Sequence, residues 1–128
     1  MLIRNETPAD EAAIRAVNLA AFDTPAEADL VERLRGHTFP YLSLVAAKKG
    51  LIVGHVMFTP VRLPGHPRAR ILGLAPMAVL PDYQHAIDCE YVKSGEVPEA
   101  AFMILELVPG HLDGLAGTVQ YHAAFAEP

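Results

Sequence analysis

Histidine and cysteine are the first residues in this sequence whose chemistry could support a reaction. His55 follows Gly54 in an apolar stretch, where an imidazole could line an amine pocket or act as a base near neutral pH. The alternative is a packed, hydrogen-bonded structural histidine. The six histidines show no H-x-x-x-H or H-E-x-x-H spacing, and Cys89 is the only cysteine, so the sequence predicts no metal site. Flanking Asp88 and Glu90 disfavour a Cys89 thiolate, which argues against a cysteine nucleophile.

Two helices are predicted near the N-terminus, after a short strand over Leu2–Glu6. Thr7-Pro8-Ala9-Asp10 combines a capping threonine, a proline at the first helical position and an acid at the third. Apolar residues then recur at spacings of three and four up to Phe22, which indicates one buried helix face. Thr24-Pro25-Ala26-Glu27 repeats the starting pattern, and Gly36 is predicted to end the second helix.

Three strands are predicted in the middle of the chain. Apolar runs over Tyr41–Ala47 and Leu51–Leu63 are separated by Lys48-Lys49-Gly50, which is typical of a hairpin. A third strand is predicted over Ile71–Leu80. Pro76 lies inside it and cannot donate to a ladder, so it indicates a bulge or an unpaired edge.

The last third of the sequence predicts two more strands. Apolar residues favour a strand over Ala86–Val92, after a turn at Pro81-Asp82-Tyr83-Gln84, and another over Phe102–Val108. The glycine-punctuated tail from Pro109 to Pro128 is predicted to be irregular.

Length and composition limit the classes of protein that fit. With 128 residues, 52% of them hydrophobic, residues 1–128 are predicted to form a single domain with an ordinary core. A net charge of -5 without a basic cluster argues against nucleic-acid binding. A lone cysteine, no long apolar run and an acidic start predict a cytoplasmic protein without disulfides or membrane contact.

Four stretches resemble the GCN5-related N-acetyltransferase (GNAT) superfamily, in its bacterial predicted acetyltransferase subgroup. They are Met1–Phe22, Leu51–Val61, Leu72–Gln84 and Ala101–Gly117. The resemblance implies an α/β (α+β) fold with two N-terminal helices on a mainly antiparallel sheet. It also implies acetyl transfer from acetyl-CoA to a small-molecule or peptide amine.

The resemblance places the cofactor against the fourth strand. In the superfamily this strand has a bulge whose backbone groups bind the pantetheine arm and polarise the thioester, and Pro76 and Met77 fall there. Free backbone N–H groups suit this task, since they can stabilise an oxyanion. The cofactor-binding residues implied are Met77, Ala78, Val79 and Gln84. The alternative is that they are ordinary strand and strand-end residues.

The sequence departs from the superfamily after Gln84. The superfamily continues Q/R-x-x-G-x-G/A, a glycine loop that wraps the CoA pyrophosphate at a helix N-terminus. Gln84 fits the first position, but the glycines fall on Ile87 and Cys89, beside the acidic Asp88 and Glu90. The phosphate loop is therefore predicted to be absent, together with roughly forty to fifty residues that would form a second helical layer and a strand.

Two functions follow from this shortened sequence. One is an acetyltransferase-family domain whose acetyl-CoA binding is weak. The other is a non-catalytic remnant or interaction module that associates through an exposed sheet edge along Ile71–Leu80, and a homodimer is one such association.

Overall fold

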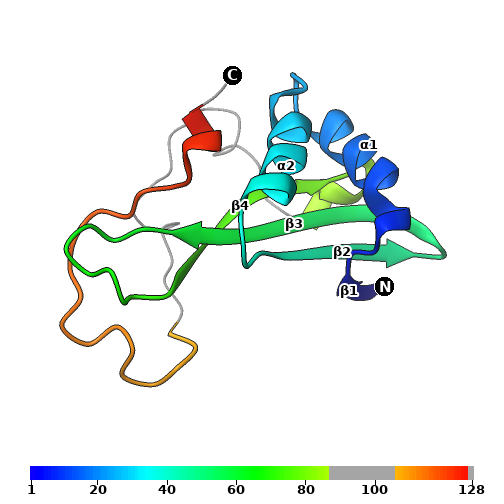
Figure 1. Cartoon of the computed structure of the whole chain (residues 1–128). Coiled ribbons are helices and arrows are strands. Elements are labelled where there is room, and N and C mark those ends of the chain that lie inside the picture. The colour runs from blue at the N-terminus through cyan, green and yellow to red at the C-terminus, as the bar shows by residue number, and fades with distance from the viewer. Residues whose placement is uncertain (87–105, 127–128) are drawn as a thin grey trace.

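The computed structural model describes residues 1–86 and 106–126. One strand, two α-helices and three further strands follow one another along the first two thirds of the chain, and the four antiparallel strands form one sheet in the order β1-β2-β3-β4 (Figure 1). The α-helices and strands are β1 (Leu2–Asn5), α1 (Glu11–Ala21), α2 (Ala26–His37), β2 (Leu42–Lys48), β3 (Leu51–Val61) and β4 (Ile71–Val79). The 3-10 helices are η1 (Pro8–Asp10), η2 (Pro81–Ala86) and η4 (Ala123–Ala126).

The start of η1, which leads directly into α1, confirms the predicted capping motif. The backbone N–H of Thr7 donates to the carboxylate of Asp10 at 2.7 Å, and the Thr7 hydroxyl donates to the same oxygen at 3.0 Å. Arg4 binds that carboxylate through two further hydrogen bonds. These donors hold the pKa of Asp10 well below its usual range, the Arg4 hydrogen bonds contributing most. The short loop between β1 and α1 is thereby fixed at both ends.

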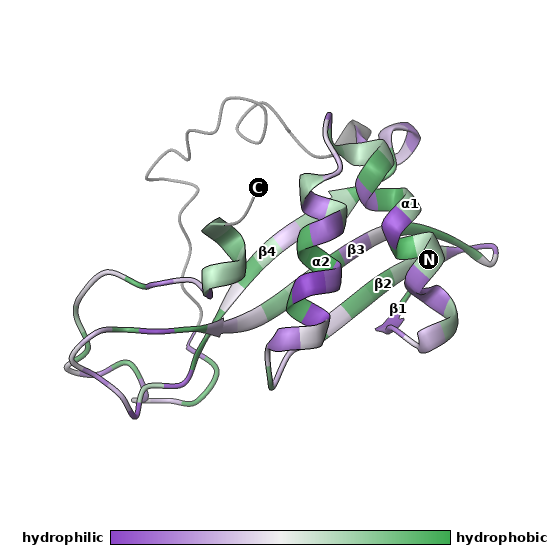
Figure 2. Ribbon diagram, turned by 45° about the horizontal axis from the view of Figure 1, so that its top comes forward, coloured by the Kyte–Doolittle hydropathy of each residue, from purple (hydrophilic) through white to green (hydrophobic). Residues whose placement is uncertain are grey.

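Both α-helices lie across one face of the sheet and cover the core there (Figures 1 and 2). The apolar spacing read from the sequence puts Ile14 and Val17 of α1 and Val31 and Leu34 of α2 at 2% exposure or less. They pack with Met57 from β3, which is fully buried. This is the predicted fold: two N-terminal helices packed on an antiparallel sheet.

The opposite face of the sheet carries a continuous apolar surface, which we call the outer sheet face. It is formed by Leu42, Leu44, Val56, Phe58, Leu72, Leu74 and Met77. The register aligns these residues into rows, because Leu42 pairs with Phe58 and Phe58 with Leu74. Leu74 and Met77 are 48% and 46% exposed, respectively. Within the described part of the chain, β4 is also an edge strand.

The structure contradicts the two strands predicted over Ala86–Val92 and Phe102–Val108, as far as their residues are described. The turn predicted at Pro81-Asp82-Tyr83-Gln84 is part of the 3-10 helix η2, which extends to Ala86, so Ala86 does not begin a strand. Glu106, Leu107 and Val108 lie outside any strand, although the sequence predicted one over Phe102–Val108. Apolar composition favoured strands there, but a strand also needs a partner that local sequence does not specify. The remainder of both predicted strands lies outside the described residues.

The C-terminal segment lies beside the connection between β3 and β4. Arg62 and Gln120 exchange two backbone hydrogen bonds, of 2.8 and 2.7 Å. The Tyr121 ring lies so close to Gly73 that a Cβ there would come within 2.6 Å of it. Ala124 of η4 is buried against the helical layer. The predicted irregular tail is therefore largely correct, with one bridge and a 3-10 turn added.

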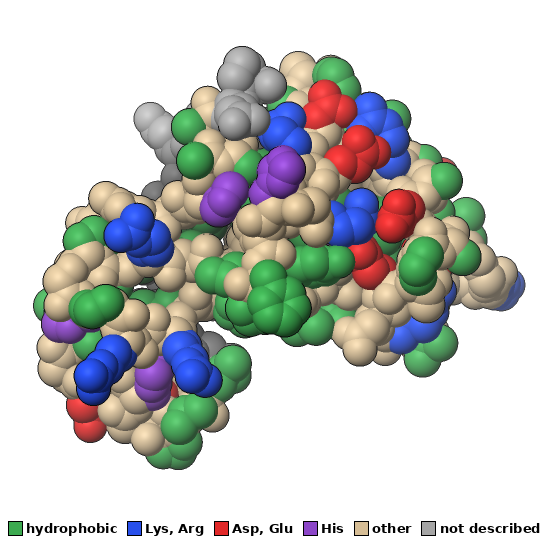
Figure 3. All heavy atoms as spheres, in the orientation of Figure 1, with side chains coloured by type: hydrophobic (Ala, Val, Ile, Leu, Met, Phe, Trp, Pro, Cys, Tyr) green, Lys and Arg blue, Asp and Glu red, His purple; other side chains and the backbone are tan. Residues whose placement is uncertain are grey.

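Charged side chains are distributed unevenly over the surface. Figure 3 shows acidic and basic side chains interspersed over the two helices, whereas basic and histidine side chains gather on the lobe made by the β3–β4 connection and the C-terminal segment. On the helices, Arg15 bridges Asp29 and Glu32 at 2.9 and 3.1 Å. None of the described helices is long and apolar enough to cross a membrane.

Candidate active site

The pairing between β3 and β4 breaks where the sequence predicts a bulge. Val56 pairs with Met77 and Phe58 pairs with Leu74, so one residue of β3, Met57, faces both Ala75 and Pro76. Proline cannot supply the ladder hydrogen bond, which explains why the extra residue is accommodated at this point. The predicted bulge is confirmed.

Beyond the bulge, β4 turns polar backbone groups toward its outer edge, which has no partner strand among the described residues. The N–H of Leu80 donates to the carbonyl of Val53 on β3 at 2.9 Å. Because peptide groups alternate in direction along a strand, the N–H and C=O groups of Val79 and Met77 point away from β3. This edge therefore offers donors and acceptors to an extended ligand arm, as the resemblance implies.

The four predicted cofactor-binding residues lie close together at the end of β4. Ala78 is buried beneath the helices, whereas the side chain of Met77 lies on the outer sheet face. Gln84 in η2 folds back, and its side-chain amide donates to the carbonyl of Val79 at 2.5 Å. Gln84 thus fixes the turn after β4 and occupies one of the edge acceptors. Ile87, Asp88, Cys89 and Glu90, which the sequence places at the phosphate loop, lie outside the described residues.

The candidate base His55 lies inside the core, one strand away from this edge. His55 pairs directly with Ala78 in the sheet register, and both residues face the helices. The histidine is only 3% exposed. Asn18 of α1 lies 3.3 Å from Nδ1, and the Ser43 hydroxyl lies 2.9 Å from Nε2. Both ring nitrogens are therefore engaged by buried neighbours.

The hydrogen bonds around His55 determine its tautomer. Asn18 Nδ2 also donates to the carbonyl of Ile14 at 3.0 Å, so this atom is the amide nitrogen and acts as a donor. Nδ1 of His55 must accept the second Asn18 hydrogen, which leaves the proton on Nε2. The Nε2–H then donates to Ser43 Oγ, and the Ser43 hydroxyl donates to the carboxylate of Glu6.

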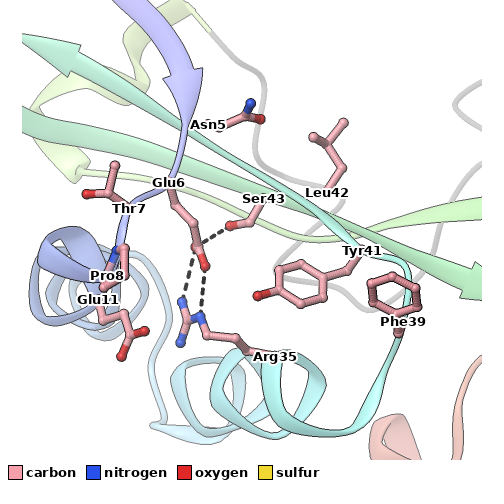
Figure 4. Close-up of a pocket in the computed structure, with 10 residues that line it drawn as sticks. All are labelled: Asn5, Glu6, Thr7, Pro8, Glu11, Arg35, Phe39, Tyr41, Leu42 and Ser43. Atoms are coloured by element: carbon pink, nitrogen blue, oxygen red, sulfur yellow. Dashed lines mark hydrogen bonds and ion pairs between the residues drawn. The ribbon is translucent and has the colours of Figure 1, made fainter.

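The chain of hydrogen bonds ends at a half-buried ion pair between Glu6 and Arg35 (Figure 4). Arg35 Nε and Nη2 donate to the two carboxylate oxygens at 2.8 and 3.1 Å, a bidentate arrangement. Burial opposes ionisation of Glu6, but the hydrogen bonds from Arg35 and Ser43 outweigh it and hold the pKa of Glu6 below its usual range. The network ties β1, β2, β3 and both helices together.

Sequence reasoning did not identify Glu6, Arg35, Ser43 or Asn18 as members of one cluster. They lie 12 to 37 positions from their partners across the chain. The position of Asn18 could have indicated a buried hydrogen bond, because a polar residue on the apolar face of a predicted helix requires a buried partner. Its Oδ1 has no hydrogen-bond partner among the described residues.

The buried imidazole predicts a loss of stability in mild acid. Burial, assisted by the charge of Arg35 and opposed by that of Glu6, lowers the pKa of His55 to about 4. In the unfolded chain the pKa is about 6.5, so the unfolded state binds a proton first as the pH falls through 6.5. We expect the free energy of unfolding to fall by about 2 kcal/mol between pH 7 and pH 5, measured by denaturant titration.

A matched pair of variants isolates the histidine. His55→Gln keeps one donor and one acceptor but does not titrate, so it should flatten the pH dependence over this range. His37→Gln, at an exposed position on α2, should leave the dependence as it is. Equal unfolding free energies for the unsubstituted chain at pH 7 and pH 5 would contradict the prediction.

Comparisons with known proteins place this geometry in a family. No family model matches the chain. A GNAT family acetyltransferase from Brucella melitensis, solved in complex with acetyl-CoA, is 30% identical and superposes with a TM-score of 0.71 over 97% of both chains. This chain belongs to the GNAT family. The N-acetyltransferase YhbS from Escherichia coli, solved in complex with CoA, is 28% identical with a TM-score of 0.76, over 98% of this chain and 92% of that structure.

The alignment with YhbS also shows how this GNAT chain is shortened. It runs over 169 positions and covers 98% of both proteins, yet this chain has only 128 residues, so about forty positions of YhbS have no counterpart here. This agrees with the missing block inferred from the sequence. A second curated relative, the N-acetyltransferase YjhQ from E. coli, is 41% identical over 78 residues, which are 59% of this chain and 43% of YjhQ.

Proposed function

We propose that residues 1–128 form one shortened N-acetyltransferase domain, which takes the acetyl group of acetyl-CoA and transfers it to a small-molecule or peptide amine. The observation that supports this most is the free edge of β4 after the bulge. Related proteins of the family carry acetyl-CoA or CoA. In this proposal the pantetheine arm pairs with the outward backbone groups of Met77 and with the N–H of Val79, next to Ala78 and Gln84, while the Val79 carbonyl stays bound to Gln84.

The chemistry proposed at this edge needs few side chains. The amine nitrogen attacks the thioester carbonyl, an N–H group of β4 stabilises the oxyanion, and the C–S bond breaks to release the CoA thiolate. The ammonium proton leaves to solvent or to the thiolate, so acetylated amine and CoA are the products. We give His55 no part in proton transfer, because Asn18 and Ser43 engage both its ring nitrogens inside the core.

A proline substitution tests this proposal at a single backbone group. Val79→Pro removes an N–H that makes no bond to β3, and proline is tolerated at strand edges. We expect it to reduce the rate of thiol release from acetyl-CoA with a panel of primary amines by about a hundredfold, the cost of one oxyanion donor. The matched variant Val79→Ala keeps the N–H and should retain the rate within about threefold.

Two results would overturn the acetyl-transfer proposal. One is the absence of any amine-dependent thiol release at millimolar acetyl-CoA. The other is equal activity of Val79→Pro and Val79→Ala, which would show that the β4 edge does not hold the thioester.

A second candidate is a non-catalytic module that associates through the sheet, favoured by the exposed outer sheet face and the edge of β4. We propose a two-fold homodimer in which the outer sheet faces of two copies meet. A contiguous apolar surface of this kind is unusual on a soluble monomer, and a second copy related by a two-fold axis would cover it.

We also propose a cytoplasmic location, since the lone Cys89 and the absence of a disulfide framework suit a reducing compartment. The net charge of -5 gives no general attraction to nucleic acid or to anionic membrane surfaces.

A further inference from the structure

The connection between β3 and β4 and the C-terminal segment together form a lobe next to the start of β4. We call it the basic lobe and define it as residues 62–70 and 106–120. Arg62, Arg68 and Arg70 lie exposed on it, and Figure 3 shows basic and histidine side chains gathered there. Because a strand rises about 3.3 Å per residue, Arg70 lies about 20 Å along β4 from Pro76 at the bulge.

The arginines of the basic lobe differ from arginines elsewhere in having no carboxylate partner among the described residues. Arg4, Arg15 and Arg35 each bind a carboxylate, at 2.7, 2.9 and 2.8 Å. The sequence explains part of the difference, since no aspartate or glutamate lies between Glu32 and Asp82. A guanidinium without a partner keeps its planar fork of donors available for a carboxylate or phosphate.

The basic lobe places an apolar side chain next to these free charges. The N–H of Arg70 donates to Nε2 of His111 at 3.1 Å, and the N–H of His111 donates to the carbonyl of Val108 at 3.0 Å. The turn over residues 108–111 therefore lies against Arg70. Val108 is 63% exposed on this turn, and the preceding Leu107 is 78% exposed. One surface thus combines guanidinium groups with aliphatic side chains.

Two carboxylates in the basic lobe oppose its arginines only in part. Glu106 accepts hydrogen bonds from the backbone N–H groups of Gly110 at 2.7 Å and Leu112 at 3.1 Å, so its charge is held at its own turn. Asp113 is exposed. The positive excess of the lobe is therefore small and local, within a chain of net charge -5. It suits a short anionic segment, whereas a long polyanion would meet repulsion from the rest of the chain.

We propose that the basic lobe is a docking surface for an acidic segment of another protein, in which carboxylates alternate with aliphatic side chains. The carboxylates bind the guanidinium groups of Arg68 and Arg70, and the aliphatic side chains cover Leu107 and Val108. A single-stranded nucleic acid fits less well, because it stacks its bases on aromatic rings and the lobe contains no Phe, Tyr or Trp. Docking here needs no acetyl-CoA and does not depend on acetyl transfer.

Fluorescence anisotropy with a pair of labelled peptides tests the basic lobe on the full chain. The first peptide has four glutamates and two leucines, and the second has lysines in place of the glutamates. At low salt, where screening is weak, we expect the glutamate peptide to bind with a dissociation constant of about 100 μM or tighter, and the lysine peptide to bind at least about tenfold more weakly.

Surface substitutions localise the binding. The double variant Arg68→Gln with Arg70→Gln should weaken binding of the glutamate peptide about five- to tenfold, because two ion pairs are lost at exposed positions. Asp113→Asn should strengthen it about twofold, since it removes a repelling carboxylate beside the arginines. Lys49→Gln, at an exposed cation in the turn between β2 and β3, should leave the affinity unchanged.

Three results would overturn the docking proposal: no measurable binding of the glutamate peptide at millimolar concentration, equal affinity for the two peptides, or equal affinity of the double variant and Lys49→Gln. Tighter binding of a short oligothymidylate than of the glutamate peptide would also overturn it, because the lobe would then be a nucleic-acid site. A chain that binds the peptide but releases no thiol from acetyl-CoA would contradict acetyl transfer and leave the docking surface in place.

Discussion

Acetyl-CoA is expected to bind this chain at least about a thousandfold more weakly than it binds YhbS from E. coli in the same buffer. The reason is the absence of the glycine loop after Gln84, where Ile87 and Cys89 stand at the glycine positions. Several charge-assisted hydrogen bonds to the pyrophosphate are lost with it, each worth about 1.5–3 kcal/mol. Isothermal titration at physiological salt measures the affinity.

A truncated cofactor separates the two halves of the site. If the β4 edge still holds the pantetheine arm, S-acetylpantetheine should bind this chain within about threefold of acetyl-CoA, since neither ligand gains phosphate contacts. YhbS should prefer acetyl-CoA strongly. A micromolar dissociation constant of this chain for acetyl-CoA would show that the prediction is wrong and that another part of the chain binds the phosphates.

Self-association through the outer sheet face is the second large effect. We expect light scattering at micromolar concentration to give twice the chain mass of 13.8 kDa. Leu74→Glu should return the chain to a monomer, because it places a carboxylate at a position that a second copy would cover. Burying that charge costs several kcal/mol, which weakens a dimer at least about a hundredfold.

A matched substitution on the helical layer serves as the control. Leu19 on α1 is 44% exposed, close to the 48% of Leu74, so Leu19→Glu changes the same chemistry on the other side of the molecule. It should leave the dimer intact. A sharp monomer mass for the unsubstituted chain, without binding of an apolar dye, would show that the chain covers its own outer sheet face.

The helices and central strands were predictable because their signals are local. The pattern Thr7-Pro8-Ala9-Asp10 marks a helix start within four residues. In the structure the Asp10 carboxylate accepts hydrogen bonds from the backbone N–H and the hydroxyl of Thr7. Pro76 has no backbone N–H to donate to a partner strand, so the bulge could be predicted without knowing which strand pairs with β4. The predicted starts of β3 and β4 agree with the observed ones, and the other boundaries of β2, β3 and β4 differ by one or two residues.

The role of His55 could not be predicted in the same way. An imidazole in a strand is consistent both with a packed core residue and with a base in a pocket, and the sequence favours the core residue without deciding the matter. The difference depends on whether the adjacent helix presents Asn18 to one ring nitrogen and whether β2 brings Ser43 to the other. Those contacts are set by strand register and helix packing, over separations of 37 and 12 residues.

The sequence by itself determined the elements, the bulge in β4 and the departure from the family after Gln84. These depend on hydrogen-bonding capacity and conformational preference of neighbouring residues. Only the tertiary structure decided that Glu6 meets Arg35, that a pocket opens beside them, and that one sheet face is apolar and exposed among the described residues. Such features arise because packing brings together groups from distant positions, whose combined charge and burial no local pattern encodes.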